Sequence, residues 1–62
     1  MQEIFMYKGY LIELTYEKFG DFYHAQVFKN GKKYDYCQSE DRDFCIFDAK
    51  RIIDFSIESE EI

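Results

Sequence analysis

The sequence predicts a small α+β protein, in which a three-stranded antiparallel sheet packs on one C-terminal helix. Residues 10–38 alternate apolar and polar side chains with the period of two that is typical of half-buried strands. From Phe44 onward the apolar period changes to the 3.6 residues of a helix. The chain has 62 residues, so we expect a single domain, 1–62, that buries only about 60% of its unfolded surface. Aromatic residues, 21% of the chain, supply large side chains for so small a core.

The first two predicted strands follow Gly9 and Gly20. In residues 10–18 four alternate apolar positions predict a core face, Tyr10, Ile12, Leu14 and Tyr16. The outer face carries Glu13, Thr15 and Glu17. Residues 22–28 are rich in aromatic and other β-favouring residues. For this strand we assign Tyr23, Ala25 and Val27 to the core, and to the outer face Phe22, His24, Gln26 and Phe28.

Asn30-Gly31 predicts a two-residue hairpin, because both central residues of a type I′ turn need positive φ. The third strand is then residues 32–38, which completes a meander over residues 9–38. We expect Tyr34 and Tyr36 on its core face, and on its outer face Lys33, Asp35 and Cys37. Residues 1–8 form either a short fourth strand at the edge or an extended arm, and Lys8-Gly9 would turn or bulge the chain.

A helix is predicted over residues 42–57, after a polar break that ends the sheet. Asp41 or Asp43 is the expected N-cap, since short carboxylates satisfy the first backbone N–H groups. The apolar stripe of the helix consists of Cys45, Ala49, Ile52, Ile53 and Ser56. Residues 58–62 are expected to be a frayed acidic tail. One helix covers one face of a small sheet, so the other face must meet water or a partner.

Charge and hydropathy narrow the function classes. Thirteen acidic and eight basic residues give a net charge of −5, which disfavours direct binding to a phosphate backbone. No apolar run approaches the roughly 20 residues that span a bilayer. The N-terminal segment lacks the basic region of a signal peptide. We therefore expect a cytoplasmic protein that does not bind membranes.

Catalytic, metal and cofactor sites are not expected. Two cysteines and one histidine do not make a zinc signature, so Cys37 and Cys45 are expected to be free thiols, with a structural disulfide or a metal site as alternatives. A small enzyme built on a Cys37–His24 pair is a further alternative. Nothing in the sequence indicates a third orienting group, an oxyanion loop or a pocket for it.

The outer sheet face combines acidic and apolar side chains, which suits recognition of a protein partner. The alternative is that these residues pair across strands and only shield the sheet. Phe44 and Phe55 lie outside the apolar stripe of the helix and would either touch the sheet edge or support self-association into a homodimer. The candidate partner-binding residues are Glu13, Glu17, Phe22, His24, Phe28, Asp35, Phe44 and Phe55.

The order of these signals is similar in layout to the arm-type, AP2-like DNA-binding domains of phage and transposon integrases. The segments that carry the resemblance are Tyr7-Lys8-Gly9-Tyr10, Tyr23-His24-Ala25-Gln26-Val27, Asn30-Gly31 and Ala49-Lys50-Arg51-Ile52-Ile53-Asp54. The resemblance implies three strands and a helix, with the sheet laid in the major groove of DNA. The present chain departs from that pattern, because Glu13, Glu17 and Asp35 stand where such a face is basic.

In size and charge the chain also resembles small acidic phage proteins that inhibit CRISPR and restriction systems. This resemblance implies that carboxylates replace phosphates in a groove lined by Lys and Arg. The leading hypothesis is therefore a non-enzymatic interaction module, an inhibitor or nucleic-acid mimic that binds a basic or nucleic-acid-binding protein. The alternative is a nucleic-acid-associated domain of the integrase-arm type that uses Lys29, Lys32 and Lys33 at the hairpin tip.

Overall fold

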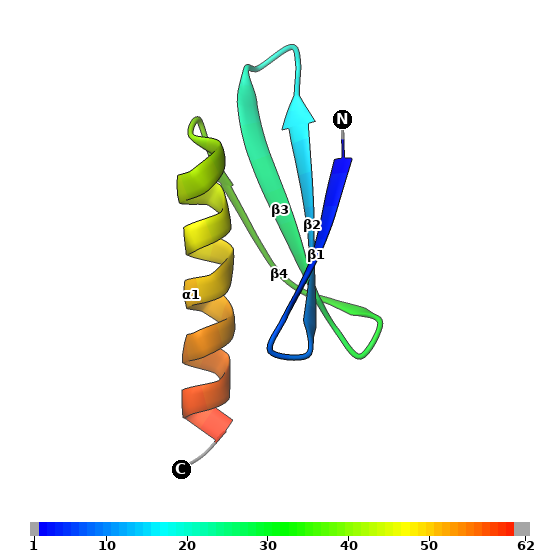
Figure 1. Cartoon of the computed structure of the whole chain (residues 1–62), viewed down its shortest axis with the longest axis vertical. Helices are drawn as coiled ribbons and strands as arrows, with labels where there is room; N and C mark the ends of the chain where they lie inside the picture. The colour runs from blue at the N-terminus through cyan, green and yellow to red at the C-terminus, as the bar shows by residue number, and fades with distance from the viewer. Residues whose placement is uncertain (1, 61–62) are drawn as a thin grey trace.

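Four antiparallel strands and one helix form the fold, in a computed structural model that describes residues 2–60. The strands lie in one sheet in the order of the chain, and the helix follows them (Figure 1). The elements are β1 (Gln2–Tyr7), β2 (Tyr10–Glu17), β3 (Phe22–Lys29), β4 (Lys32–Ser39) and α1 (Arg42–Glu60). The predicted α+β class is confirmed, and the N-terminal segment joins the sheet as a full edge strand rather than an arm.

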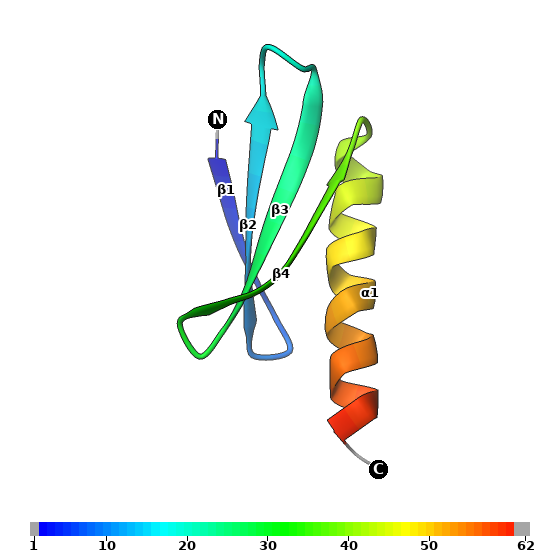
Figure 2. The same ribbon diagram turned by 180° about the vertical axis from the view of Figure 1, so that it is seen from behind.

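The core lies between one face of the sheet and α1, which runs along that face in both views (Figures 1 and 2). Ala25 and Ala49 are fully buried, and their small side chains leave room for the helix to approach β3. The sheet supplies Tyr10, Ile12, Leu14, Ala25 and Val27, and the helix supplies Cys45, Ala49 and Ile53. These positions match the predicted core faces of β2 and β3 and most of the predicted stripe of α1.

Two hairpins close with turns in which both central residues have positive φ. Asn30 and Gly31 have φ of 53° and 78°, which confirms the predicted hairpin. Lys8 and Gly9 have φ of 50° and 85° and join β1 to β2 in the same way. The chain therefore turns, rather than bulges, at Lys8-Gly9.

The predicted register of β4 is wrong beyond Tyr34. The β3–β4 ladder shifts by one residue at Val27/Phe28, where Phe28 pairs with Lys33 but Val27 pairs with Asp35. This β-bulge adds one residue to β4, and an extra residue exchanges the faces of all later side chains. Asp35 and Cys37 therefore lie on the helix side of the sheet, and Tyr36 lies on the opposite side, whereas Lys33 keeps its predicted place.

The N-cap of α1 is Asp41, one of the two predicted candidates. Its Oδ1 accepts hydrogen bonds from the backbone N–H groups of Asp43, at 2.8 Å, and Phe44, at 3.3 Å. These bonds satisfy two of the donors that a helix start leaves free.

The predicted helix end at residue 57 is wrong, because α1 continues to Glu60. Lys29, at the end of β3, donates to the Glu60 carboxylate, and this ion pair ties the last turn to the sheet. The predicted frayed tail is thus helical at 58–60. Residues 61 and 62 of that tail, and residue 1 of the predicted arm, lie outside the described residues. No helix within residues 2–60 is both long and apolar enough to span a bilayer.

Polar contacts connect β1 to both ends of α1. Near the helix start, Arg42 donates to both carboxylate oxygens of Glu3, at 2.7 and 3.0 Å. Near its end, the Asp54 carboxylate accepts from the Tyr7 hydroxyl at 3.0 Å and from Lys8 Nζ at 2.7 Å. β1 therefore runs in the same direction as α1 and is fixed to it at two points.

Candidate functional site

The candidate site is the side of the sheet that α1 does not cover, which we call the bare face. Strand pairing arranges its side chains in rows that cross the strands. The first row is Met6, Leu11, Phe28 and Lys33; the second is Ile4, Glu13, Gln26 and Tyr36; the third is Gln2, Thr15, His24 and Gln38. Glu17 and Phe22 pair beyond the third row. The rows divide the face into an apolar end and an aromatic end.

The apolar end contains a shallow hollow of about 320 Å³ near the two I′ turns. Met6 is 66% exposed and Ile4 is 60% exposed, whereas Leu11 and Phe28 are half-buried. Glu13 lies at the border of the hollow, which is lined by Met6, Gly9, Leu11, Glu13, Phe28 and Gly31. An open apolar surface with a carboxylate beside it suits a partner on which an apolar side chain lies next to a basic one.

The aromatic end is a chain of ring contacts across β3 and β4. The ring of His24 lies between those of Phe22, at 6.0 Å, and Tyr36, at 5.7 Å between ring centroids. The Nε2 atom of His24 is 3.8 Å from Oε2 of Glu17. These rings present π faces and one carboxylate, groups that attract Lys and Arg side chains.

Five of the eight predicted site residues meet on the bare face: Glu13, Glu17, Phe22, His24 and Phe28. Asp35 is not among them, since the bulge places it on the helix side of the sheet. There it lines a hollow of about 440 Å³ between β4 and α1, together with Tyr34, Arg51, Ile52 and Phe55.

Phe44 and Phe55 lie on the outer part of α1 and are 52% and 71% exposed. Phe44 stacks on Phe47, with ring centroids 6.0 Å apart, and Phe55 borders the hollow beside β4. The exposure of Phe44 does not fit the alternative that it packs on the sheet edge. These two residues therefore belong to the helix surface, separate from the bare face.

Three apolar or aromatic residues of the bare face were missed from the sequence: Ile4, Met6 and Tyr36. Ile4 and Met6 alternate with the half-buried Phe5 and Tyr7, a short period-2 signal that could have identified an edge strand. Tyr36 gave no such signal, because its face depends on the bulge.

The Cys37–His24 alternative is wrong, because the two residues lie on opposite sides of the sheet. Cys37 packs against the core beside Cys45, and both are free thiols. The Cys37 thiol is 3.6 Å from the Cys45 carbonyl oxygen. Burial raises the pKa of Cys37 to about 12 and also raises that of Cys45, so both stay protonated near neutral pH. Within residues 2–60, no three His, Cys, Asp or Glu side chains gather as a metal site would require.

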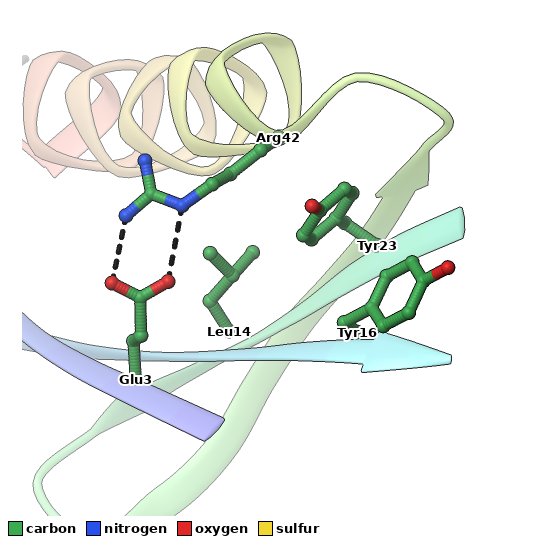
Figure 3. A pocket seen from close by; sticks show the side chains of 5 residues that line it. All are labelled: Glu3, Leu14, Tyr16, Tyr23 and Arg42. Atoms are coloured by element: carbon green, nitrogen blue, oxygen red, sulfur yellow. Dashed lines mark hydrogen bonds and ion pairs between the residues drawn. The ribbon is translucent and has the colours of Figure 1, made fainter. Parts of the chain in front are cut away.

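A third hollow, on the helix side of the sheet near the start of α1, is less suited to ligands. It measures about 260 Å³ and lies between the Glu3–Arg42 ion pair and the rings of Tyr16 and Tyr23, with Leu14 between them (Figure 3). Small-molecule sites usually occupy about 300–1,000 Å³. Its two charged groups already bind one another. They therefore join β1 to α1 and are not free to bind a ligand.

Of the three lysines predicted to bind nucleic acid at the hairpin tip, one is already paired within the protein. Lys29, Lys32 and Lys33 line one hollow at the β3–β4 turn. Lys29, however, is paired with Glu60 and lies over the rings of Tyr10 and Tyr34, 5.7 and 5.9 Å from their centroids. The hairpin therefore presents a weaker positive charge than the sequence indicates.

Comparison of the chain with known protein families, with curated proteins and with solved structures finds no match.

Proposed function

We propose that this protein is a non-enzymatic interaction module whose bare face binds a basic protein. The observation that carries the proposal is the apolar hollow with Glu13 at its border, on the face that α1 leaves uncovered. Exposed apolar residues of this kind are common singly but are uncommon as a connected row. Here Met6, Leu11 and Phe28 are direct cross-strand neighbours.

The charge of the partner follows from the acidic groups around that row. Among the ion pairs formed within residues 2–60, none uses Glu13, and Glu17 faces only the histidine. The whole chain carries a net charge of −5, which accelerates encounter with a basic surface. The row would supply apolar contact area, and Glu13 and Glu17 would select Lys or Arg.

The finer proposal, that the protein inhibits its partner by mimicking nucleic acid, has less support. It requires several carboxylates on one surface, and the bare face holds Glu13 and Glu17 but not Asp35. A nucleic-acid-associated role through the hairpin tip is the alternative. The ion pair between Lys29 and Glu60 leaves that role with Lys32 and Lys33 as its cations.

Affinity capture with matched variants tests the proposal. Immobilised wild-type protein, Phe28→Ser, Glu13→Lys and the helix-surface control Phe44→Ser would be exposed to a lysate of the native host, and retained proteins identified by mass spectrometry. We expect at least one basic protein that wild type and Phe44→Ser retain and that both bare-face variants lose. The purified partner should bind wild type more weakly as salt concentration rises.

Two results would contradict the proposal. One is retention of the same proteins by wild type and all three variants, which would show that the bare face is not used. The other is tight, salt-sensitive binding to duplex DNA that Lys32→Glu and Lys33→Glu abolish, which would favour the integrase-arm alternative.

A further inference from the structure

The two edge strands of the sheet differ in their protection against pairing with another chain. β4 carries Lys32, Lys33 and a bulge, devices that commonly prevent edge pairing. β1 has none of them: it pairs with β2 over its whole length without a register shift. Its one charged side chain, Glu3, is already bound to Arg42. Among residues 2–60, β1 is therefore an open edge of the sheet.

The hairpin geometry identifies which backbone groups of β1 face outward. In a two-residue I′ hairpin the residues beside the turn, here Tyr7 and Tyr10, form a hydrogen-bonded pair. Hydrogen-bonded and non-hydrogen-bonded pairs then alternate along the ladder, so Tyr7, Phe5 and Glu3 direct their N–H and C=O groups to β2. The backbone groups of Gln2, Ile4 and Met6 point to the open edge. Their side chains lie on the bare face, where Ile4 and Met6 are exposed.

We propose that two copies of this chain pair antiparallel through β1, with Ile4 of one copy opposite Ile4 of the other. In this register Gln2 of each copy pairs with Met6 of the other, so all the outward N–H and C=O groups find partners. The two sheets join into one continuous sheet of eight strands, twice the four of each copy.

The side chains of β1 suit a second copy in this register. On the bare face the two Ile4 side chains meet at the symmetry axis, and Met6 of each copy lies beside them, opposite Gln2 of the other copy. On the helix side Glu3 lies opposite Phe5, so the two Glu3 carboxylates do not face each other. No pair of like charges opposes the association along the strand.

The position of α1 also permits this arrangement. Antiparallel pairing of two edge strands places the two-fold axis perpendicular to the sheet. Both helices therefore lie on the same face of the joined sheet. α1 packs mainly on β3 and β4 and contacts β1 through the side chains of Arg42 and Asp54, so the body of the helix lies away from that axis. Stacking of two bare faces, in contrast, would bring Glu13 and Glu17 of both copies together in a pair of chains that each carry −5. Edge pairing avoids this repulsion and leaves the bare face free for another partner.

Charged substitutions at Ile4 test the proposal. The mass of each protein would be measured by sedimentation velocity at concentrations from low to high micromolar. We expect wild type to approach the mass of a dimer. Ile4→Lys and Ile4→Glu should each stay monomeric, because each places two like charges on the axis. An equimolar mixture of the two should recover the dimer, since Lys then faces Glu. The control Phe28→Lys, on the bare face but two strands from the edge, should still form dimers.

Each contrary result overturns the proposal. If wild type stays monomeric at every concentration, a second copy of the chain does not pair with β1. A dimer that survives Ile4→Lys, or a mixture that stays monomeric, excludes the register about Ile4. Loss of the dimer in Phe28→Lys indicates association through the bare face instead. Circular dichroism of each variant confirms that it is folded, and the exposure of Ile4 makes its replacement compatible with the monomer fold.

Discussion

The hydroxyl oxygens of Tyr10, at the start of β2, and Ser56, near the end of α1, lie 3.0 Å apart in the protein interior. Tyr10 is 5% exposed and Ser56 is 6% exposed, so each hydroxyl has little water to bond with. This hydrogen bond links the start of β2 to the C-terminal part of α1 and fixes the position of the helix along the strand.

Removing either hydroxyl should therefore destabilise the fold. We expect Ser56→Ala and Tyr10→Phe each to lower the free energy of unfolding by about 1–3 kcal/mol, because each leaves a buried polar group unpaired. The double variant should lose less than the sum of the two, since it removes both groups together. Urea unfolding, followed by circular dichroism, measures these differences. Strictly additive losses would show that the two hydroxyls do not interact.

Most of the fold could be predicted from local patterns. The period-2 alternation of residues 10–18 and 22–28 placed Tyr10, Ile12, Leu14, Ala25 and Val27 in the core, where all five are buried. The Asn30-Gly31 turn and the Asp41 cap were also predictable, because each depends on the conformational preferences of one or two residues.

The errors arose where distant contacts decide the structure. The bulge in β4 shifts the alternation after Tyr34, and no residue type in that strand marks it. α1 extends to Glu60 because Lys29 binds there, a contact between residues far apart in sequence. For the candidate site, Glu13 and Phe28 were predictable from alternation. Asp35 was misplaced by the bulge. Ile4 and Met6 were missed because so short a segment fits either an edge strand or an arm.

The chemical reactivity of Cys37 tests the register of β4. Since burial raises its pKa from about 9 to about 12, the thiolate fraction at pH 8 falls roughly a thousandfold. We expect iodoacetamide to modify Cys37 in the folded protein about that much more slowly than in urea, as measured by mass spectrometry after digestion. Folded-state modification at the rate of a free cysteine would place Cys37 on the bare face, as the unshifted register requires.

The acid stability of the protein should depend on the two carboxylates that join β1 to α1. The hydrogen bond from Arg42 lowers the pKa of Glu3, and that from Lys8 lowers the pKa of Asp54. A carboxyl with a lower pKa in the folded state stabilises the fold above its unfolded pKa of about 4, and this contribution disappears as the pH falls through the folded pKa. Glu3→Gln with Asp54→Asn should therefore be less stable than wild type at pH 7, and the difference should shrink below pH 4. Thermal unfolding across pH 2–7 measures this difference in stability. The control is Glu58→Gln, because the carboxyl of Glu58 forms no ion pair within residues 2–60. If the difference in stability between wild type and the double variant stays constant down to pH 2, the charge of these carboxylates does not hold β1 on the helix.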